Sequence, residues 1–505
     1  MKSLNKNIMR ALLLLSYIAI TVIIVLGIGS VISYLNTGAD RSKMLHTEIK
    51  KIDQYLPKLE WAPLKNEGRP MDMQTLKSIE TDYLDAWYVR HVAYKTNTTQ
   101  GIEDYYTENA RTSIYNFIEK NSNDNIWIDG TTLEHHLTLE FFSEDGQLVV
   151  LRDKDVLEYK RLYQNDEILL ETREVSTYKI IMLLEDGFWR TRHLIKEKSE
   201  PYQQKLTSVS KTITNIKGIN YYPQATPWNL YGDDFDKNII SKDFKIIKEA
   251  GLNSIRIFVP YDDFGRANVT SDKLEKLKTV LNLAENQQLK VVITLFDFYG
   301  DYEVLNWTLN QHHAINIVSA LKDHNALLAW DIKNEPNLDF ESRGKTKVLA
   351  WAEQMIQTVK STDTIHPVTI GWSNTESATI LKDKVDFVSF HYYEDLDALE
   401  TEYKTLKTNI PDKPVIITEF GLSSYRGLWR PFGNSEEDQA DHHKAAQTLF
   451  AKNDIQFMSW TLYDFTEIPK EVVGRLPWRK QAQGYFGFID QNGETKPAFK
   501  YISKE

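Results

Sequence analysis

The C-terminal part of this chain repeats one pattern, in which a short apolar run typical of a β-strand precedes a helical segment. From residue 212 onward eight such runs follow in order: ITNIKGINY, SIRIFVP, KVVITLFD, LLAWDIKNEP, PVTIGW, VDFVSFHYY, PVIITEFG and IQFMSWTLYDF. Amphipathic stretches such as LEKLKTVLNLAENQQ and TKVLAWAEQMIQTVK separate them. Eight strands alternating with helices over residues 212–505 predict an α/β fold, a parallel (β/α)8 TIM barrel.

A different pattern precedes the barrel and predicts a separate α+β unit over residues 71–198. It starts with two helical stretches, the first with apolar residues at helical spacing and the second covering residues 101–120. Strands follow, beginning with strict alternation from Leu133 to Phe141 and ending in two long strands near 168–184 and 188–196. The helical spacing of the first stretch is set by Leu76, Ile79, Tyr83 and Trp87.

Helices followed by a meander of long antiparallel strands favour one curved sheet packed against helices. This order, together with the ending EDGFWRTRHLI, resembles the nuclear-transport-factor-like fold, which implies a cone-shaped sheet. The unit contains no convergent set of carboxylates or metal ligands. We therefore interpret it as a structural or interaction module with a possible protein partner, rather than as a second enzyme.

The N-terminal region predicts a membrane anchor. Residues 11–35 form 25 consecutive positions without a charged side chain, which is long enough to cross a bilayer. Lys2, Lys6 and Arg10 precede the segment and favour a cytoplasmic N-terminus over residues 1–10. The alternative is a cleaved signal peptide, but a small-x-small cleavage site is not evident. We expect a single-pass protein of the cell membrane, with residues 36–70 as a spacer and the rest outside the cytoplasm.

Charge and cysteine content exclude several classes of function. The 505 residues carry a net charge of -11, which argues against nucleic acid as a partner. The sequence contains no cysteine, so disulfides, thiolate metal sites and a cysteine nucleophile are excluded.

Polar side chains end several of the eight apolar runs. In a TIM barrel the active site lies at the carboxyl ends of the strands, so these residues are candidates for function. A single glutamate or histidine there could be a salt-bridge partner or a cap, but ionisable groups gathered at an apolar barrel mouth cost stability and are harder to explain structurally. The candidates are Arg256, Asp297, Asn334, Glu335, His391, Tyr393, Glu419 and Trp460.

Four of the motifs around these residues, taken together, resemble the clan A retaining glycoside hydrolases, and family 5, the cellulase and mannanase family, most closely. They are NEP at 334–336, TEFG at 418–421, Gly-Leu-Asn-Ser-Ile-Arg-Ile at 251–257 and His-Tyr-Tyr at 391–393. The resemblance covers about residues 215–503 and includes the ending GYFGFIDQNGETKPAF.

The resemblance implies a role for each candidate and requires no cofactor or metal. Glu335 is expected to be the general acid/base and Glu419 the nucleophile, held ionised by Arg256 and Tyr393. Asn334 is expected to contact the sugar 2-hydroxyl, while Trp460 and His391 form the floor and a wall of the −1 subsite. Further subsites are expected from aromatic residues in the loops, for which a structural role is equally compatible: Tyr222, Trp228, Trp429 and Trp478.

One position departs from the family pattern. Family 5 barrels commonly carry a histidine near the end of strand three, where this chain has Asp297. Asp297 could contact a sugar hydroxyl or cap the following segment, so the identity of the sugar stays open.

Together these features predict a membrane-anchored retaining β-glycosidase that hydrolyses an extracytoplasmic β-linked polysaccharide or oligosaccharide. Two alternatives stay open. One is a non-catalytic glycan-binding or scaffold protein in envelope polysaccharide assembly, and the other is a transglycosylase that uses the same residues.

Overall fold

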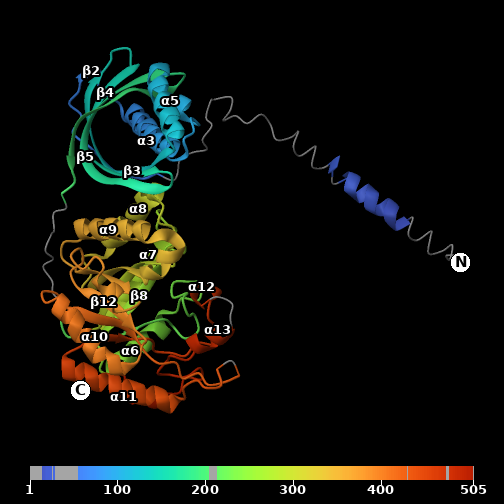
Figure 1. Ribbon diagram of the computed structural model, residues 1–505, viewed down its shortest axis with the longest axis vertical. Helices are drawn as coiled ribbons and strands as arrows, with labels where there is room; N and C mark the ends of the chain where they lie inside the picture. The colour runs from blue at the N-terminus through green and yellow to red at the C-terminus, as the bar shows by residue number, and fades with distance from the viewer. Residues whose placement is uncertain are drawn as a thin grey trace.

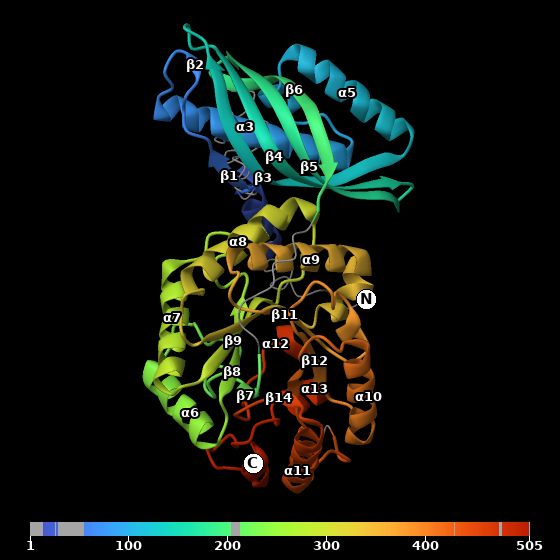
Figure 2. The same cartoon turned by 90° about the vertical axis from the view of Figure 1, so that its left-hand side faces the viewer.

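The computed structural model describes residues 14–25, 27–28, 55–203, 213–428, 430–473 and 477–503. Within these ranges the chain forms a curved sheet with its helices, followed by a closed barrel (Figures 1 and 2). In both views the sheet unit lies against the barrel at helices α8 and α9.

The C-terminal unit is a closed barrel of eight parallel strands in the order β7 to β14, with β14 pairing back to β7. This confirms the predicted TIM barrel. Its strands are β7 (Lys217–Asn220), β8 (Ser254–Pro260), β9 (Lys290–Asp297), β10 (Leu327–Asn334), β11 (Val368–Trp372), β12 (Val388–Tyr392), β13 (Val415–Phe420) and β14 (Gln456–Ser459). Nearly every strand residue is buried, because the barrel interior and the surrounding helices cover both faces.

Helices surround the barrel and follow the strands in sequence. They are α6 (Lys237–Glu249), α7 (Ser271–Asn286), α8 (Trp307–Leu321), α9 (Lys345–Thr362), α10 (Leu396–Asn409) and α11 (Glu436–Asn453), with two short helices, α12 (Lys470–Val473) and α13 (Pro477–Gln483), near the end. Local sequence sets several starts. Asp236 caps α6 by accepting from the backbone of Asn238 and Ile239, and Ser435 and Asp438 form a capping box at α11.

The N-terminal unit contains the helices α3 (Met73–Thr96), α4 (Ile102–Tyr105) and α5 (Glu108–Asn123). Four long antiparallel strands follow, β3 (Ile126–Phe142), β4 (Leu148–Gln164), β5 (Glu167–Glu185) and β6 (Phe188–Pro201). The sheet curves around α3 (Figures 1 and 2), whose residues Ile79, Tyr83 and Trp87 are buried against it. The likeness to the nuclear-transport-factor fold stays a prediction.

Part of the predicted spacer belongs to this unit. Strands β1 (Lys58–Trp61) and β2 (Glu67–Gly68) both pair in parallel with β3, and Tyr55 is buried in the core beneath the sheet. Sequence reasoning missed these strands because they are short and the segment has prolines at 57, 63 and 70.

The predicted membrane segment is described only in part. Residues 14–25 and 27–28 are helical, whereas residues 11–13, 26 and 29–35 lie outside the described ranges. Among the described residues, no helix combines the length and the apolarity that crossing a membrane requires.

Candidate active site

A cavity of about 580 Å³ lies where the carboxyl ends of the barrel strands meet. Six of the sequence candidates line it, namely Asp297, Asn334, Glu335, Tyr393, Glu419 and Trp460. Each occurs at or next to the end of its strand, as the fold requires of functional residues. Aromatic side chains cover one side of this cavity, including Tyr222, Trp228 and Phe258, and Trp460 lies 5.8 Å from Trp228 between ring centres.

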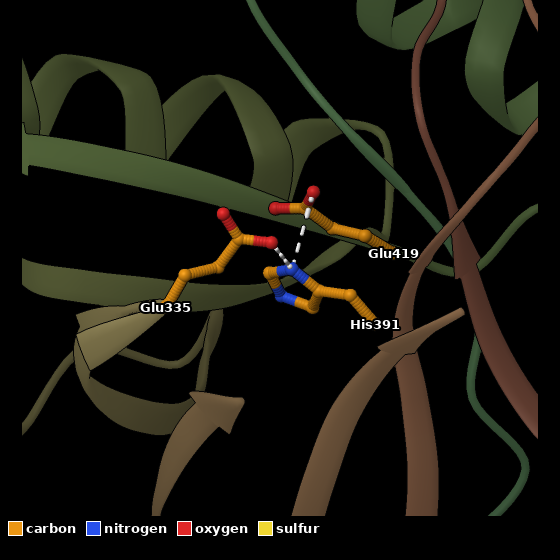
Figure 3. Close-up of side chains that lie close together, drawn as sticks. All are labelled: Glu335, His391 and Glu419. Atoms are coloured by element: carbon orange, nitrogen blue, oxygen red, sulfur yellow. Dashed lines mark hydrogen bonds and ion pairs between the residues drawn. The ribbon is translucent and has the colours of Figure 1, made fainter. Parts of the chain in front are cut away.

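The two glutamates face one another across the cavity (Figure 3). Glu335 follows β10 directly, and Glu419 lies near the end of β13, beside His391 of β12 in the sheet register. One oxygen of Glu335, one oxygen of Glu419 and a ring nitrogen of His391 all lie within 4.8 Å of one another. Carboxyl groups lie about 5–5.5 Å apart in retaining glycosidases and about 6.5–9.5 Å apart in inverting ones, so two carboxylate oxygens this close favour the retaining arrangement.

Two hydrogen-bond donors hold the Glu419 carboxylate. Arg256 Nη1 donates to Oε1 at 2.5 Å and the Tyr393 hydroxyl donates to Oε2 at 3.0 Å. Burial and the charges of Glu419 and Glu335 raise the pKa of Tyr393 well above its ordinary value, so Tyr393 stays protonated and can keep donating. Charge-assisted bonds of this kind fix the carboxylate in one orientation, which is what a nucleophile needs.

Besides Glu419 on β13, partners on two other strands, β7 and β10, fix Arg256. Its guanidinium donates to Asp331 at 2.6 Å and 3.0 Å, to Asn220 at 3.0 Å and to Asn334 at 2.8 Å. Burial lowers the pKa of Arg256, but the charges of Asp331 and Glu419 outweigh it and raise this pKa. Because the Asn334 Oδ1 oxygen accepts from Arg256, its amide NH2 is left to donate to a ligand in the cavity.

Glu335 is hydrogen-bonded to His391, which lies deeper in the barrel. The distance between His391 Nδ1 and Glu335 Oε1 is 2.7 Å, and Nδ1 also lies 3.4 Å from Glu419 Oε2 (Figure 3). His391 Nε2 is buried and has no hydrogen-bond partner within the described part of the chain. A proton on Nε2 would be an unsatisfied buried donor, so we infer that Nδ1 carries the proton and donates it to Glu335.

The backbone at Glu335 adopts an uncommon conformation, with φ 47° and ψ 48° in the left-handed region. Such a conformation costs a non-glycine residue about 1–3 kcal/mol. The Glu335 N–H donates to the Gly371 carbonyl at 2.8 Å, which ties this position to the neighbouring strand β11. The strained backbone therefore has a partner that holds it.

Competing effects act on the pKa of Glu335. Burial raises this pKa, while the hydrogen bond from His391 and the charges of Arg256 and Lys333 lower it more, leaving it below its ordinary value. The side chain of Glu335 is still 24% exposed. A bound sugar that covers it removes that water and raises the pKa, which is the direction a general acid needs.

This geometry predicts a shift in the pH profile when His391 is replaced. In the variant His391→Leu the donor to Glu335 is lost, so the carboxylate is less stabilised and its pKa rises. We expect the alkaline limb of the plot of kcat/KM against pH, which reports an acid in the free enzyme, to move to higher pH. The variant His391→Asn keeps a donor near the Nδ1 position and should retain more of the wild-type profile, whereas equal profiles for all three proteins would contradict this role.

Asp297 and Lys333 place a second pair of charges on the cavity wall. Burial raises the pKa of Asp297 to about 6, although Lys333 and Arg256 oppose the shift, and the Tyr222 hydroxyl lies 3.4 Å from its Oδ2. Burial also lowers the pKa of Lys333, whose ammonium lies 3.6 Å from Asp339. Near pH 6 Asp297 can therefore either donate to or accept from a sugar hydroxyl.

The structure differs from the sequence expectation at His391. This residue was expected to form a wall of the −1 subsite, but it is 1% exposed and is not among the residues lining the cavity. Arg256 is 0% exposed and bonds to Glu419, the contact expected of it. Tyr222 and Trp228 line the cavity as expected. Trp429 lies outside the described residues, as does the side chain of Trp478.

Sequence reasoning also missed several residues at the site. Lys333 and Asp331 carried a readable signal, because each is a charged residue within the apolar run that ends at Glu335. The loop residues carried none, since their approach to the cavity depends on loop conformation. They include Asp339, Arg343 and Phe486.

The three closely spaced groups of Glu335, His391 and Glu419 also resemble a ligand set for a divalent cation. Arg256, however, already bonds to Glu419, and Lys333 lines the same cavity, so positive charge is supplied by side chains where a cation would bind. The donor set therefore suits nucleophilic and acid–base chemistry better than metal binding.

Comparisons with known proteins agree with this geometry. The family model for cellulase, glycosyl hydrolase family 5, matches residues 208–466. A putative mannan endo-1,4-beta-mannosidase 4 from Arabidopsis thaliana is 28% identical over an alignment of 265 residues, and the match covers 44% of this chain and 63% of the relative. A beta-glucuronidase from Homo sapiens is 23% identical, over 51% of this chain and 40% of its own length. The chain thus spans less than two thirds of these two relatives.

Solved structures give a weaker likeness. An exo-beta-1,4-mannosidase from Opitutaceae bacterium strain TAV5 superposes with a TM-score of 0.47 at 15% identity, covering 60% of this chain and 61% of that chain. This likeness is too low to support a conclusion about the site.

Proposed function

The chain belongs to glycosyl hydrolase family 5, a family of glycoside hydrolases, and on that premise we propose that it is a retaining β-glycosidase. Its substrate is a β-linked polysaccharide or oligosaccharide, hydrolysed by double displacement. The observation that carries the proposal is the approach of Glu335 and Glu419 to within 4.8 Å, with Arg256 and Tyr393 fixing Glu419.

In the first step the Glu419 carboxylate attacks the anomeric carbon while Glu335 gives its proton to the departing glycosidic oxygen. The bond to the leaving sugar breaks and a glycosyl ester of Glu419 forms. Arg256 and Tyr393 orient the attacking oxygen, and the donation from His391 adjusts the proton affinity of Glu335.

In the second step Glu335, now a carboxylate, removes a proton from a water molecule that attacks the anomeric carbon. The ester to Glu419 breaks, and the product leaves with the β-configuration it started with. Asn334 is placed to donate to the 2-hydroxyl of the sugar, where hydrogen bonds strengthen as positive charge develops on the ring. Trp460 offers an aromatic face for the same sugar.

Mannan is the first substrate to test, because the curated relatives include mannan endo-1,4-beta-mannosidases. Asp297 stands at the end of β9, where family 5 barrels commonly carry a histidine. Because this difference leaves the identity of the sugar open, β-glucans and xylans are tested beside mannan. Whether the enzyme cuts within a chain or at its end follows from the sizes of the products.

The N-terminal region completes the proposal. Residues 11–35 anchor the protein in the cell membrane with the barrel outside the cytoplasm, supported by 25 uncharged positions preceded by Lys2, Lys6 and Arg10. The unit at 71–198 is then a module of nuclear-transport-factor type between membrane and barrel. Protease added to intact cells should digest the barrel. If the barrel is instead protected from the protease, it lies inside the cell and the proposed orientation is wrong.

The test of the activity is to incubate the protein with soluble β-1,4-mannan, β-1,4-glucan and β-1,4-xylan and to follow the first product by proton NMR. We expect one of them to be cut and the new reducing end to appear as the β-anomer before mutarotation. An α-anomer would contradict the retaining mechanism. Binding of one glycan without any cleavage would favour the scaffold alternative, and products longer than the substrate would favour the transglycosylase.

A further inference from the structure

We propose that the N-terminal α+β unit fixes one wall of the candidate active site through contacts with the β9–α8 loop, residues 298–303. Lys95 of α3 and Tyr159 of β4 are then positioning residues for a cavity that they do not line. The expected effect on turnover rests on the glycosidase function proposed above, whereas the expected effect on the loop itself does not.

The β9–α8 loop forms part of the cavity wall. Phe298, Tyr299 and Gly300 line the cavity next to Asp297, the last residue of β9. The Tyr299 ring stacks on Trp351 of α9 at 5.0 Å, and its hydroxyl donates to Asn310 at 2.7 Å. The loop is therefore anchored on its barrel side by an aromatic contact and a buried hydrogen bond.

The other end of the loop is held by the N-terminal unit. Glu303, the last loop residue, forms an ion pair with Lys95 of α3 and a second one with Lys347 of α9 at 2.8 Å. Lys95 also lies 3.1 Å from Asp129, a β3 carboxylate that is only 1% exposed. Burial raises the pKa of Glu303, but its bonds to Lys347 and Lys95 outweigh this and hold the pKa at about 2, so Glu303 is charged at neutral pH.

Aromatic packing forms a second contact between the two units, at Trp307, shortly after Glu303 in the chain. Trp307, the first residue of α8, is fully buried, and its ring lies 4.4 Å from that of Tyr159. The indole N–H of Trp307 donates back to the carbonyl of Tyr302 in the loop at 3.3 Å. The hydrophobic cluster of the barrel core also includes three buried residues of the sheet, Leu133, Leu157 and Tyr159. Buried apolar side chains therefore join the two units.

The contact between the two units also reaches the segment after β10, which forms another part of the cavity wall. Tyr302 donates a hydrogen bond to Asp339, which lines the cavity after β10. Arg161 of β4 is 0% exposed and donates to the carbonyl of Thr346 at 2.9 Å, near the start of α9. The N-terminal unit thus supports both segments that carry Tyr299 and Asp339 to the cavity.

Loss of the Lys95 contact should loosen this wall. Without the ammonium, the buried Asp129 carboxylate loses its ion-pair partner, and Glu303 keeps its ion pair with Lys347. Hydrogen bonds to charged groups are among the stronger contributions to local stability. A loop that opens more often binds substrate less well, but the two glutamates and Arg256 are not displaced, so KM should rise more than kcat falls.

The experiment compares five full-length proteins: wild type, Lys95→Met, Lys95→Arg, Glu303→Gln and Arg152→Met. Arg152 is the matched control, because like Lys95 it bridges two carboxylates. Its partners, Glu140 and Glu197, both lie in the sheet and not in the barrel. Its side chain is 27% exposed, against 23% for Lys95. Hydrogen–deuterium exchange is read on peptides covering residues 298–306, and KM and kcat are measured on soluble β-1,4-mannan, β-1,4-glucan and β-1,4-xylan. Glu303→Gln removes the same contact from the barrel side and is measured in parallel.

We expect exchange over residues 298–306 to be about tenfold faster in Lys95→Met and Glu303→Gln. Lys95→Arg should restore slow exchange, and Arg152→Met should match wild type. On the glycan that wild type cleaves, KM should rise in the same two variants. Unchanged exchange in Lys95→Met and Glu303→Gln overturns the proposal, as does an equal effect of Arg152→Met. If wild type cleaves no glycan, the glycosidase proposal fails while the exchange data still decide this one.

Discussion

Glu419→Ala is expected to lower kcat by about 10⁴-fold or more on any glycan that the wild-type enzyme cleaves. Without the carboxylate no glycosyl ester can form, so the double displacement loses its first step. The fold should persist, because Arg256 keeps Asp331, Asn220 and Asn334 as partners after the substitution. Turnover is measured by reducing-end release, and folding by the thermal midpoint.

Two further measurements separate loss of the nucleophile from general damage. Glu419→Gln keeps the size of the side chain and should be as inactive as the alanine variant. Added azide should restore turnover in Glu419→Ala by attacking the anomeric carbon from the vacated space, giving an α-glycosyl azide. Retention of wild-type kcat in either variant would remove Glu419 from the mechanism.

Glu335→Gln is expected to have the second largest effect, and its size should depend on the leaving group. A glutamine cannot donate a proton to the departing oxygen, so cleavage of a glycan should slow by about 10²- to 10⁴-fold. An aryl glycoside with an acidic phenol as leaving group needs no such proton and should form the glycosyl-enzyme at nearly the wild-type rate. The measurement is the release of the phenol in the first turnover.

The same variant tests the second half of the reaction. Breakdown of the glycosyl-enzyme requires a base for water, so Glu335→Gln should show a burst of phenol followed by a slow steady state. Azide, which needs no base, should remove the slow phase and yield a β-glycosyl azide. Equal slowing of the glycan and of the aryl glycoside would show that Glu335 does not act as the acid.

The barrel could be predicted from sequence because each of its strands is buried on both faces. A strand of that kind is a continuous apolar run, and eight such runs mark eight strands without any tertiary information. The same logic located the candidate residues, since a polar group that ends an apolar run must emerge at the mouth of the barrel. Glu335 and Glu419 were found in this way, and the structure brings them together.

Depth within the barrel could not be predicted from the sequence. Arg256 and Glu419 both belong to apolar runs with polar residues, yet Arg256 lies in the middle of β8 and is fully buried, whereas Glu419 lies next to the end of β13 and reaches the cavity. Interior residues of a barrel form layers, and the sequence does not show which layer a residue occupies. His391 was expected as a wall, but it lies beneath both glutamates for the same reason. The loop residues Asp339 and Arg343 depended on loop conformation, which the local pattern does not encode.

The contact between the two units was also not predicted from sequence. Lys95, Asp129 and Glu303 are ordinary surface charges in the sequence, and only the folded chain places them together. Tyr159 lies on the outer face of β4, and the local sequence of that strand does not show what covers this face.

The central claim is that Glu419 becomes covalently linked to the sugar during turnover. The most direct test is to incubate the protein with a 2-deoxy-2-fluoro β-glycoside that carries an activated leaving group, built on the sugar that the enzyme accepts. Peptide mass spectrometry should then find one glycosyl adduct, located on Glu419. An adduct on another residue, or complete absence of an adduct from a protein that turns over the parent glycan, would contradict the account.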